Sequence, residues 1–174
     1  AGVCGRVRAA GRAESERDGL VVREMLGETA ETGIKALTLW QPWASAIALG
    51  LKQYETRSWA TSYRGPLGIH ASRADRPEGR ELYWTEMTLG RLPKGGLPCG
   101  VMLCVVDLTA VIPTAEAELI IGPIEKLYGN YAPGRFAGKL DNLRVLVEPI
   151  PVRGSQGLWT WDRELASLTF TVAP

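Results

Sequence analysis

Lys52, Glu55 and Arg57 lie close together in the segment KQYETRSW at residues 52–59. A carboxylate can activate water as a general base, and a lysine or arginine can stabilise an oxyanion or bind a phosphate. The alternative is structural, because Glu55 and Arg57 share one face of a strand, where an ion pair would only orient the arginine. Strict alternation places Lys52 on the other face. It lies at a predicted helix-to-strand junction, however, so the sequence leaves a direct Lys52–Glu55 pair open.

Trp40, Gln41 and Trp43 form a second group of candidate ligand-binding residues, in the segment WQPW before a short predicted helix. Tryptophans in such a place often plug the end of a barrel, which is the commoner fate of a single indole. They can also stack on a nucleobase, and free N–H groups at a helix start can receive an anion. For either tryptophan alone the sequence favours the plug over the stacking platform. It is also compatible with one tryptophan as a plug and the other as a platform.

Asp107 is the third unusual residue, because it lies in the apolar segment VMLCVVDLTAV at residues 101–111. A carboxylate with apolar neighbours needs a partner or its pKa rises, and such a group near a lysine is a candidate acid or base. The structural alternative is an aspartate at a barrel mouth that accepts backbone hydrogen bonds, and the two stay open. Arg64 and Arg153, each followed by a glycine, are weaker candidates for phosphate contacts.

Charge and composition exclude several classes of protein. The net charge of the 174-residue chain is +1, so any phosphate binding must come from a local basic patch. A single histidine, His70, argues against a His-based zinc site or a Ser-His-Asp triad, and we expect no metal and no other cofactor. The longest apolar run, residues 101–106, is too short to cross a bilayer. The odd number of cysteines, Cys4, Cys99 and Cys104, argues against a disulfide framework and favours a reducing, cytoplasmic setting.

The apolar pattern of a folded domain begins at Ile34. Residues 1–33 contain no aromatic residue and are interpreted as a flexible extension, which places the domain at residues 34–174. The sequence predicts strands at 34–40, 52–59, 64–72, 100–111, 134–152 and 168–172, and helices at 42–49, 76–90 and 113–121. Short strands with few helices favour an α+β fold that is mainly β, a small antiparallel barrel with short helices at its ends.

The motifs around these candidates resemble the ASCH domain, the activating signal cointegrator homology family. The resemblance extends over residues 34–161 and rests on PWAS, Gly50-x-Lys52, Glu55-x-Arg57-Ser58-Trp59, Arg64-Gly65 and Ile69, and on the later segments LPCGVMLCVVDL, GNYAPGRFAGKL and PVRGSQGLW. It implies a PUA-like β-barrel with a cleft for RNA or a nucleotide. In that family a lysine and an acid line the cleft with an acid from a later strand, and these positions correspond to Lys52, Glu55 and Asp107.

The leading interpretation is therefore an RNA- or nucleotide-binding module, with single-stranded RNA, a nucleotide or a nucleoside as partner and no membrane. A first alternative is an enzyme in the same cleft, since some small bacterial relatives are N4-acetylcytidine amidohydrolases and others have been described as ribonucleases. Lys52, Glu55 and Asp107 would then be catalytic. Those amidohydrolases carry threonine three residues after the lysine, where this chain has Glu55. A second alternative is a protein-interaction module, of the kind found in a transcription coactivator.

Overall fold

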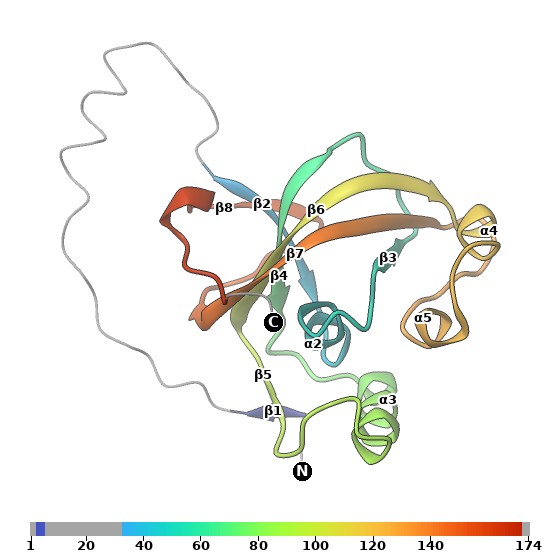
Figure 1. Cartoon of the computed structure of the whole chain (residues 1–174), viewed down its shortest axis with the longest axis horizontal. Helices are drawn as coiled ribbons and strands as arrows, with labels where there is room; N and C mark the ends of the chain where they lie inside the picture. The colour runs from blue at the N-terminus through green and yellow to red at the C-terminus, as the bar shows by residue number, and fades with distance from the viewer. Residues whose placement is uncertain (1–2, 6–32, 172–174) are drawn as a thin grey trace.

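The computed structural model describes residues 3–5 and 33–171, and a six-stranded sheet dominates them (Figure 1). The strand order is β3-β7-β6-β4-β2-β8, and a separate two-stranded sheet pairs β1 with β5. The large sheet consists of β2 (Ile34–Leu39), β3 (Tyr54–Arg57), β4 (Gly65–Ala71), β6 (Val101–Pro113), β7 (Phe136–Pro151) and β8 (Leu158–Trp161). The other elements are β1 (Cys4–Gly5), β5 (Leu97–Pro98), α2 (Trp43–Ala48), α3 (Pro77–Thr88), α4 (Thr114–Ala117), α5 (Pro123–Leu127) and the 3-10 helix η1 (Leu165–Ser167).

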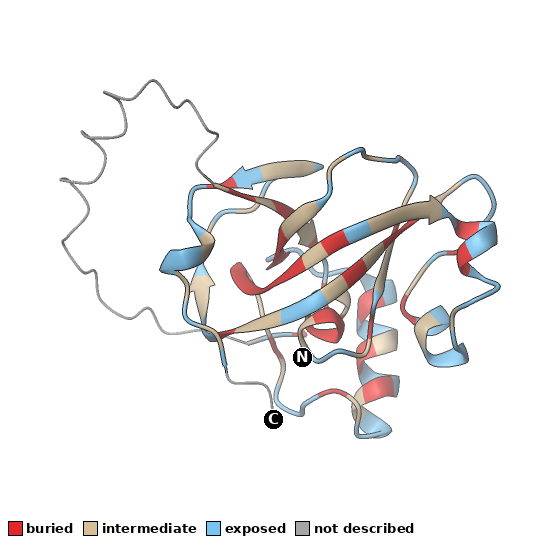
Figure 2. Ribbon diagram, turned by 45° about the horizontal axis from the view of Figure 1, so that its top comes forward, coloured by how far each residue is buried: buried red, intermediate tan, exposed pale blue. Residues whose placement is uncertain are grey.

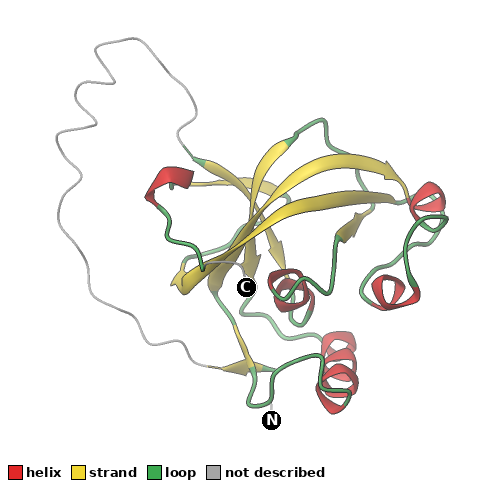
Figure 3. Ribbon diagram, in the orientation of Figure 1, coloured by secondary structure: helices red, strands yellow, loops and turns green. Residues whose placement is uncertain are grey.

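Pairing in the large sheet is mostly antiparallel. β6 and β7 are the longest strands, with 13 and 16 residues, and they pair with each other, while β2 and β4 form a parallel pair. The predicted fold class, mainly β with short helices, is confirmed. The sheet curls but is not closed into a barrel, because β3 and β8 remain unpaired edges in the described part of the chain (Figure 3). Each of these strands has four residues, and a cavity of about 40 Å³ lined by residues of both lies in the curl.

Buried apolar side chains cover both faces of the curled sheet. Ala36 and Leu37 are successive residues of β2, so their side chains point to opposite faces and belong to different clusters. Ile47 of α2 joins the cluster of Leu37, which packs this short helix against the sheet. Figure 2 shows the buried residues along the long strands and through most of α2. Because α2 is fixed in this way, the Trp40–Pro42 segment before it is fixed too. None of the helices in the described residues is long and apolar enough to span a membrane.

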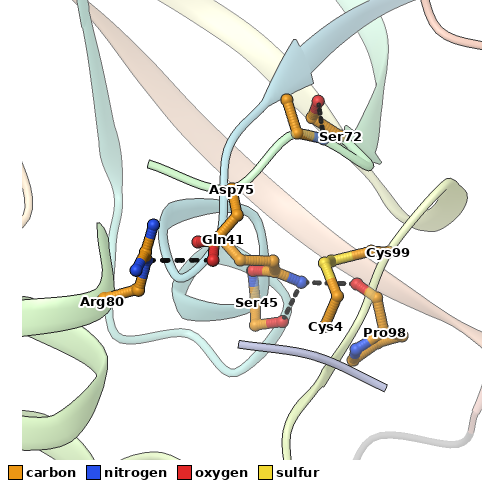
Figure 4. Close-up of a disulfide and its surroundings, with 9 residues drawn as sticks. Cys4, Gln41, Ser45, Ser72, Asp75, Arg80, Pro98 and Cys99 are labelled. Carbon is orange, nitrogen blue, oxygen red and sulfur yellow. Dashed lines mark hydrogen bonds and ion pairs between the residues drawn. A yellow bond between two sulfur atoms is a disulfide. The ribbon is translucent and has the colours of Figure 1, made fainter. Parts of the chain in front are cut away.

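The start of the chain is held against the domain by a disulfide between Cys4 and Cys99 (Figure 4). The two cysteines are 95 residues apart in the sequence, and their Cα atoms are 5.4 Å apart. Val3 beside them is buried, in an apolar cluster that includes residues of α3. Of the extension expected at residues 1–33, this short anchored segment is described, whereas residues 6–32 lie outside the described residues.

Two predictions from the sequence are wrong. The odd number of cysteines does not prevent a disulfide, because Cys104 remains as a buried free thiol while the other two pair. Burial raises the pKa of the Cys104 thiol to about 12. The cysteine count therefore gives no support for a reducing compartment. Of the closing strand predicted at residues 168–172, the described residues 168–171 form one β-bridge, between Phe170 and Leu146, and β8 takes the edge position instead.

Candidate functional site

A cleft of about 410 Å³ opens between the end of β2, the start of α2, β3 and the loop after α5. The side chains that matter for recognition are Trp40, Trp43, Glu55, Arg57, Trp59 and Arg135. Three of the chain's six tryptophans thus line one cavity, which we call the aromatic cleft. Its volume lies in the range of about 300–1,000 Å³ that is typical of sites for small organic ligands.

Trp40 is the most exposed aromatic residue of the aromatic cleft. It is 43% exposed, and the guanidinium carbon of Arg76 lies 4.1 Å from the centroid of its ring, in a cation–π contact. Trp43 is half-buried against α3, where a Cβ on Gly79 would stand 3.3 Å from Trp43 Cζ3. Trp40 therefore has the exposure that a stacking platform needs, and Trp43 has the packing of a plug.

Gln41, by contrast, is engaged within the protein and does not line the aromatic cleft. Its Nε2 donates to the carbonyl oxygen of Pro98 at 2.7 Å and to Ser45 Oγ at 2.8 Å, and its Oε1 accepts from the Ser45 N–H at 3.0 Å (Figure 4). These bonds satisfy the first turn of α2 and join it to the residue before Cys99. Gln41 thus supports the start of α2 through its hydrogen bonds and is not among the groups open to a ligand.

Lys52 lies beneath the aromatic cleft, with its side chain fully buried. Its ammonium donates to the carbonyl oxygens of Tyr54 and Tyr128, the latter at 2.8 Å, and lies 3.3 Å from Glu55 Oε2. Two of the three N–H donors of the lysine are used by these carbonyl oxygens, and the carboxylate of Glu55 is its ion-pair partner. The pair with Glu55 that alternation left open is therefore present. Lys52 fixes the carboxylate and the two backbone segments, and its fully buried side chain lines no part of the aromatic cleft.

Glu55 lies between two cations at the floor of the aromatic cleft. Its Oε1 is 3.0 Å from Arg57 Nε, in ion-pair contact although that N–H does not point at the oxygen, and its Oε2 faces Lys52. Arg57 also donates from Nη2 to the carbonyl oxygen of Thr38 at 3.3 Å. Glu55 and Arg57 both line the cavity. Together they present an acceptor and a set of donors, held in place from below by Lys52.

Asp107 and Arg64 do not join this group. The Asp107 carboxylate binds the Arg144 guanidinium and accepts from Asn142 Nδ2 at 2.8 Å, both on β7, and it lines no part of the aromatic cleft. The carboxylate in the apolar strand thus has partners, although they are side chains instead of backbone groups. Arg64 donates to the carbonyl oxygens of Thr61 and Tyr63 in its own turn. The second acid that the family resemblance implies is therefore not beside Lys52 and Glu55.

A buried network that sequence reasoning missed supports the far wall of the cleft. The Glu86 carboxylate in α3 is buried, pairs with both Arg91 Nε at 2.5 Å and Nη2 at 2.7 Å, and accepts from the Tyr128 hydroxyl. The Arg91 hydrogen bonds hold the pKa of Glu86 below its usual range, and burial raises that of Tyr128. The Tyr128 carbonyl oxygen also accepts a hydrogen bond from the Lys52 ammonium, so this network connects α3 to the lysine.

Arg135 lies on the opposite rim of the aromatic cleft. Its Nε donates to the carbonyl oxygen of Asn130 at 3.0 Å and its Nη2 to that of Thr56 at 3.3 Å, while Thr56 Oγ1 accepts from the Asn130 N–H. These bonds fasten the loop after α5 to β3. No local pattern could have revealed them, since residues 56 and 135 are 79 positions apart.

Comparison with known proteins gives one family. The ASCH domain model matches residues 37–142. The curated proteins named Activating signal cointegrator 1 from Mus musculus and Homo sapiens are 29% and 30% identical over 136 residues, which is 74% of this chain and 22% of each relative. The chain thus spans about a fifth of the length of these relatives. A crystal structure of a mutant ZmASCH protein from Zymomonas mobilis aligns with a TM-score of 0.42 and 15% identity, covering 68% of this chain and 75% of that one.

Proposed function

Because the chain belongs to the ASCH domain family, which is associated with RNA binding, we propose that it binds single-stranded RNA with one unpaired base in the aromatic cleft. The observation that carries this proposal is the open indole of Trp40 beside the Glu55–Arg57 pair. A flat apolar surface next to a fixed acceptor and fixed donors suits a nucleobase, which has an apolar face and a polar edge.

Stacking supplies the first part of the interaction. Trp40 and Trp59 are 43% and 37% exposed, so both indoles leave apolar area open to water at the cleft. Covering such a ring with a base contributes about 1–3 kcal/mol and tolerates any base, because every base has a π face. A base in a duplex is already stacked and paired, so an unpaired base fits this cleft better.

Polar contacts supply the second part. The Glu55 carboxylate can accept an N–H from the edge of a base, as carboxylates do from the exocyclic amine of cytosine. Arg57 can donate to a base carbonyl or a phosphate oxygen. The buried ammonium of Lys52 holds Glu55 in one place before the ligand arrives, which lowers the entropy lost on binding.

The proposal is tested by titrating single-stranded RNA and a duplex of the same sequence at several salt concentrations. With a net charge of +1 we expect two or three phosphate contacts, so the log–log slope of affinity against salt should be about −1.5 to −2 on single strands. The single strand should bind more tightly than the duplex. Preference for the duplex, or a slope steeper than about −5, would contradict binding through the cleft and indicate a broad electrostatic surface.

A further inference from the structure

A second cavity, of about 510 Å³, adjoins the aromatic cleft. The residues that line it and bear on its chemistry are Thr38, His70, Ser72, Arg73, Arg153 and Gly154. We call it the arginine cavity, because two guanidinium groups line it and no aspartate or glutamate does. Its lining therefore has positive charge without a compensating carboxylate.

Arg73 and Arg153 have neither a hydrogen-bond nor an ion-pair partner among the described residues, although Arg57, Arg91 and Arg144 each have one. Both are exposed, and they come from different segments, the loop before α3 and the loop before β8. Both guanidiniums line the same cavity, so an anion bound there would have two positively charged groups as neighbours. Planar guanidiniums bind phosphate oxygens in pairs of charge-assisted hydrogen bonds.

His70 forms a buried part of the wall of this cavity. The ring is 3% exposed, and its Nε2 lies 3.1 Å from the carbonyl oxygen of Val152, whereas its Nδ1 has no partner. A Cβ on Gly154 would stand 2.4 Å from that nitrogen, so glycine is required for the loop to pass this close. Burial, with Arg73 nearby, lowers the pKa of His70. The positive charge of the cavity at neutral pH therefore comes from the two arginines.

Thr38 connects the arginine cavity to the aromatic cleft, because it lines both. Its carbonyl oxygen accepts from Arg57 at 3.3 Å, and its Oγ1 accepts from Trp159 Nε1 at 3.1 Å. The Arg76 guanidinium over Trp40 belongs to the same loop as Arg73. One loop therefore supplies both Arg73, which lines the arginine cavity, and Arg76, which covers the ring of Trp40 in the aromatic cleft.

We propose that the arginine cavity binds the phosphodiester of the nucleotide next to the one whose base lies in the aromatic cleft. This inference rests on the proposed function and narrows it: the ligand is an RNA strand of at least two nucleotides and not a free nucleoside. Arg73 and Arg153 contact the phosphate. The wall at Thr38 separates the base from its neighbour's phosphate.

The test compares the Arg73→Gln/Arg153→Gln double variant with the wild type and with Lys94→Gln. Lys94 is exposed and lines neither cavity, so that variant gives the effect of removing one positive charge outside the two cavities, half the charge that the double variant removes. The probes are a hexauridylate RNA and uridine 5′-monophosphate. The double variant should bind the hexanucleotide at least about tenfold more weakly, with a salt slope shallower by about 0.7 for one lost phosphate contact. Its affinity for the mononucleotide and its melting temperature should match those of the wild type.

Two results would overturn the inference while leaving RNA binding in place. One is a double variant whose hexanucleotide affinity and salt slope equal those of Lys94→Gln. The other is an equal loss for the mononucleotide, which would assign the arginines to the phosphate of the nucleotide in the cleft itself. A wild-type protein that binds no hexanucleotide would overturn the proposed function and this inference together.

Discussion

Lys52→Ala should lower the free energy of unfolding by about 3–5 kcal/mol, the range observed when one partner of a buried charge pair is removed. The variant leaves the carbonyl oxygens of Tyr54 and Tyr128 without their donor and leaves Glu55 with Arg57 alone. A buried acceptor that loses its partner costs about 1–3 kcal/mol by itself. Chemical denaturation followed by circular dichroism measures the change.

Lys94→Ala is the matched control for this experiment, because the exposed Lys94 should change stability by no more than about 0.5 kcal/mol. Lys52→Met retains most of the apolar stem and removes the ammonium, so it should also be destabilised. A loss below about 1 kcal/mol in both Lys52 variants would mean that the three contacts do not support the fold. Lys52 would then be better interpreted as a ligand-binding cation, as the sequence suggested.

Trp40→Ala should weaken binding of single-stranded RNA by about 1–3 kcal/mol, or about 5- to 150-fold, because a base loses its stacking surface. Folding should be retained, since Trp40 is 43% exposed and its ring contact is with the surface residue Arg76. Trp43→Ala should instead lose stability, because the half-buried indole packs against α3 at Gly79. Thermal unfolding and RNA titration of each variant separate the two roles.

Trp84→Ala supplies the control for these aromatic variants. Trp84 lies on α3, is 47% exposed and lines neither cavity, so its loss should leave RNA affinity unchanged. If Trp40→Ala and Trp84→Ala bind RNA equally well, the open indole at the cleft is not a platform. If Trp40→Ala is unstable and its folded fraction binds normally, Trp40 belongs to the support of the domain.

Local patterns predicted the parts of the fold that depend on neighbours in the sequence. Alternation placed a strand over β2, a continuous apolar run placed one over β6, and the proline and glycine on either side of α2 placed that helix. Closure of the sheet depends on whether β3 meets β8, and these strands are about 100 residues apart in the chain. The Cys4–Cys99 disulfide depends likewise on two segments 95 residues apart, which the count of cysteines could not reveal.

In the candidate site, too, the residues close together in the sequence could be predicted and the contacts between distant residues could not. Trp40, Trp43, Glu55 and Arg57 could be proposed from the sequence because they belong to one short stretch of chain, and they do line one cavity. Asp107 could not be placed, because its partners on β7 are 35 and 37 residues away. The hydrogen bond from Lys52 to the Tyr128 carbonyl oxygen could not be predicted either, because the two residues are 76 positions apart. Residue types identified the chemistry, and long-range packing determined which groups are free to use it.

RNA should bind with a base against the tryptophans of the aromatic cleft, and the indole N–H signals of the protein report this contact. The chain has six tryptophans, which single Trp→Phe variants assign in a proton–nitrogen NMR spectrum. On titration with single-stranded RNA, the signals of Trp40, Trp43 and Trp59 should shift together, while those of exposed Trp84 and buried Trp161 stay in place. Shifts confined to Trp84, or saturable RNA binding without any shift at the three cleft tryptophans, would contradict binding of a base in the aromatic cleft.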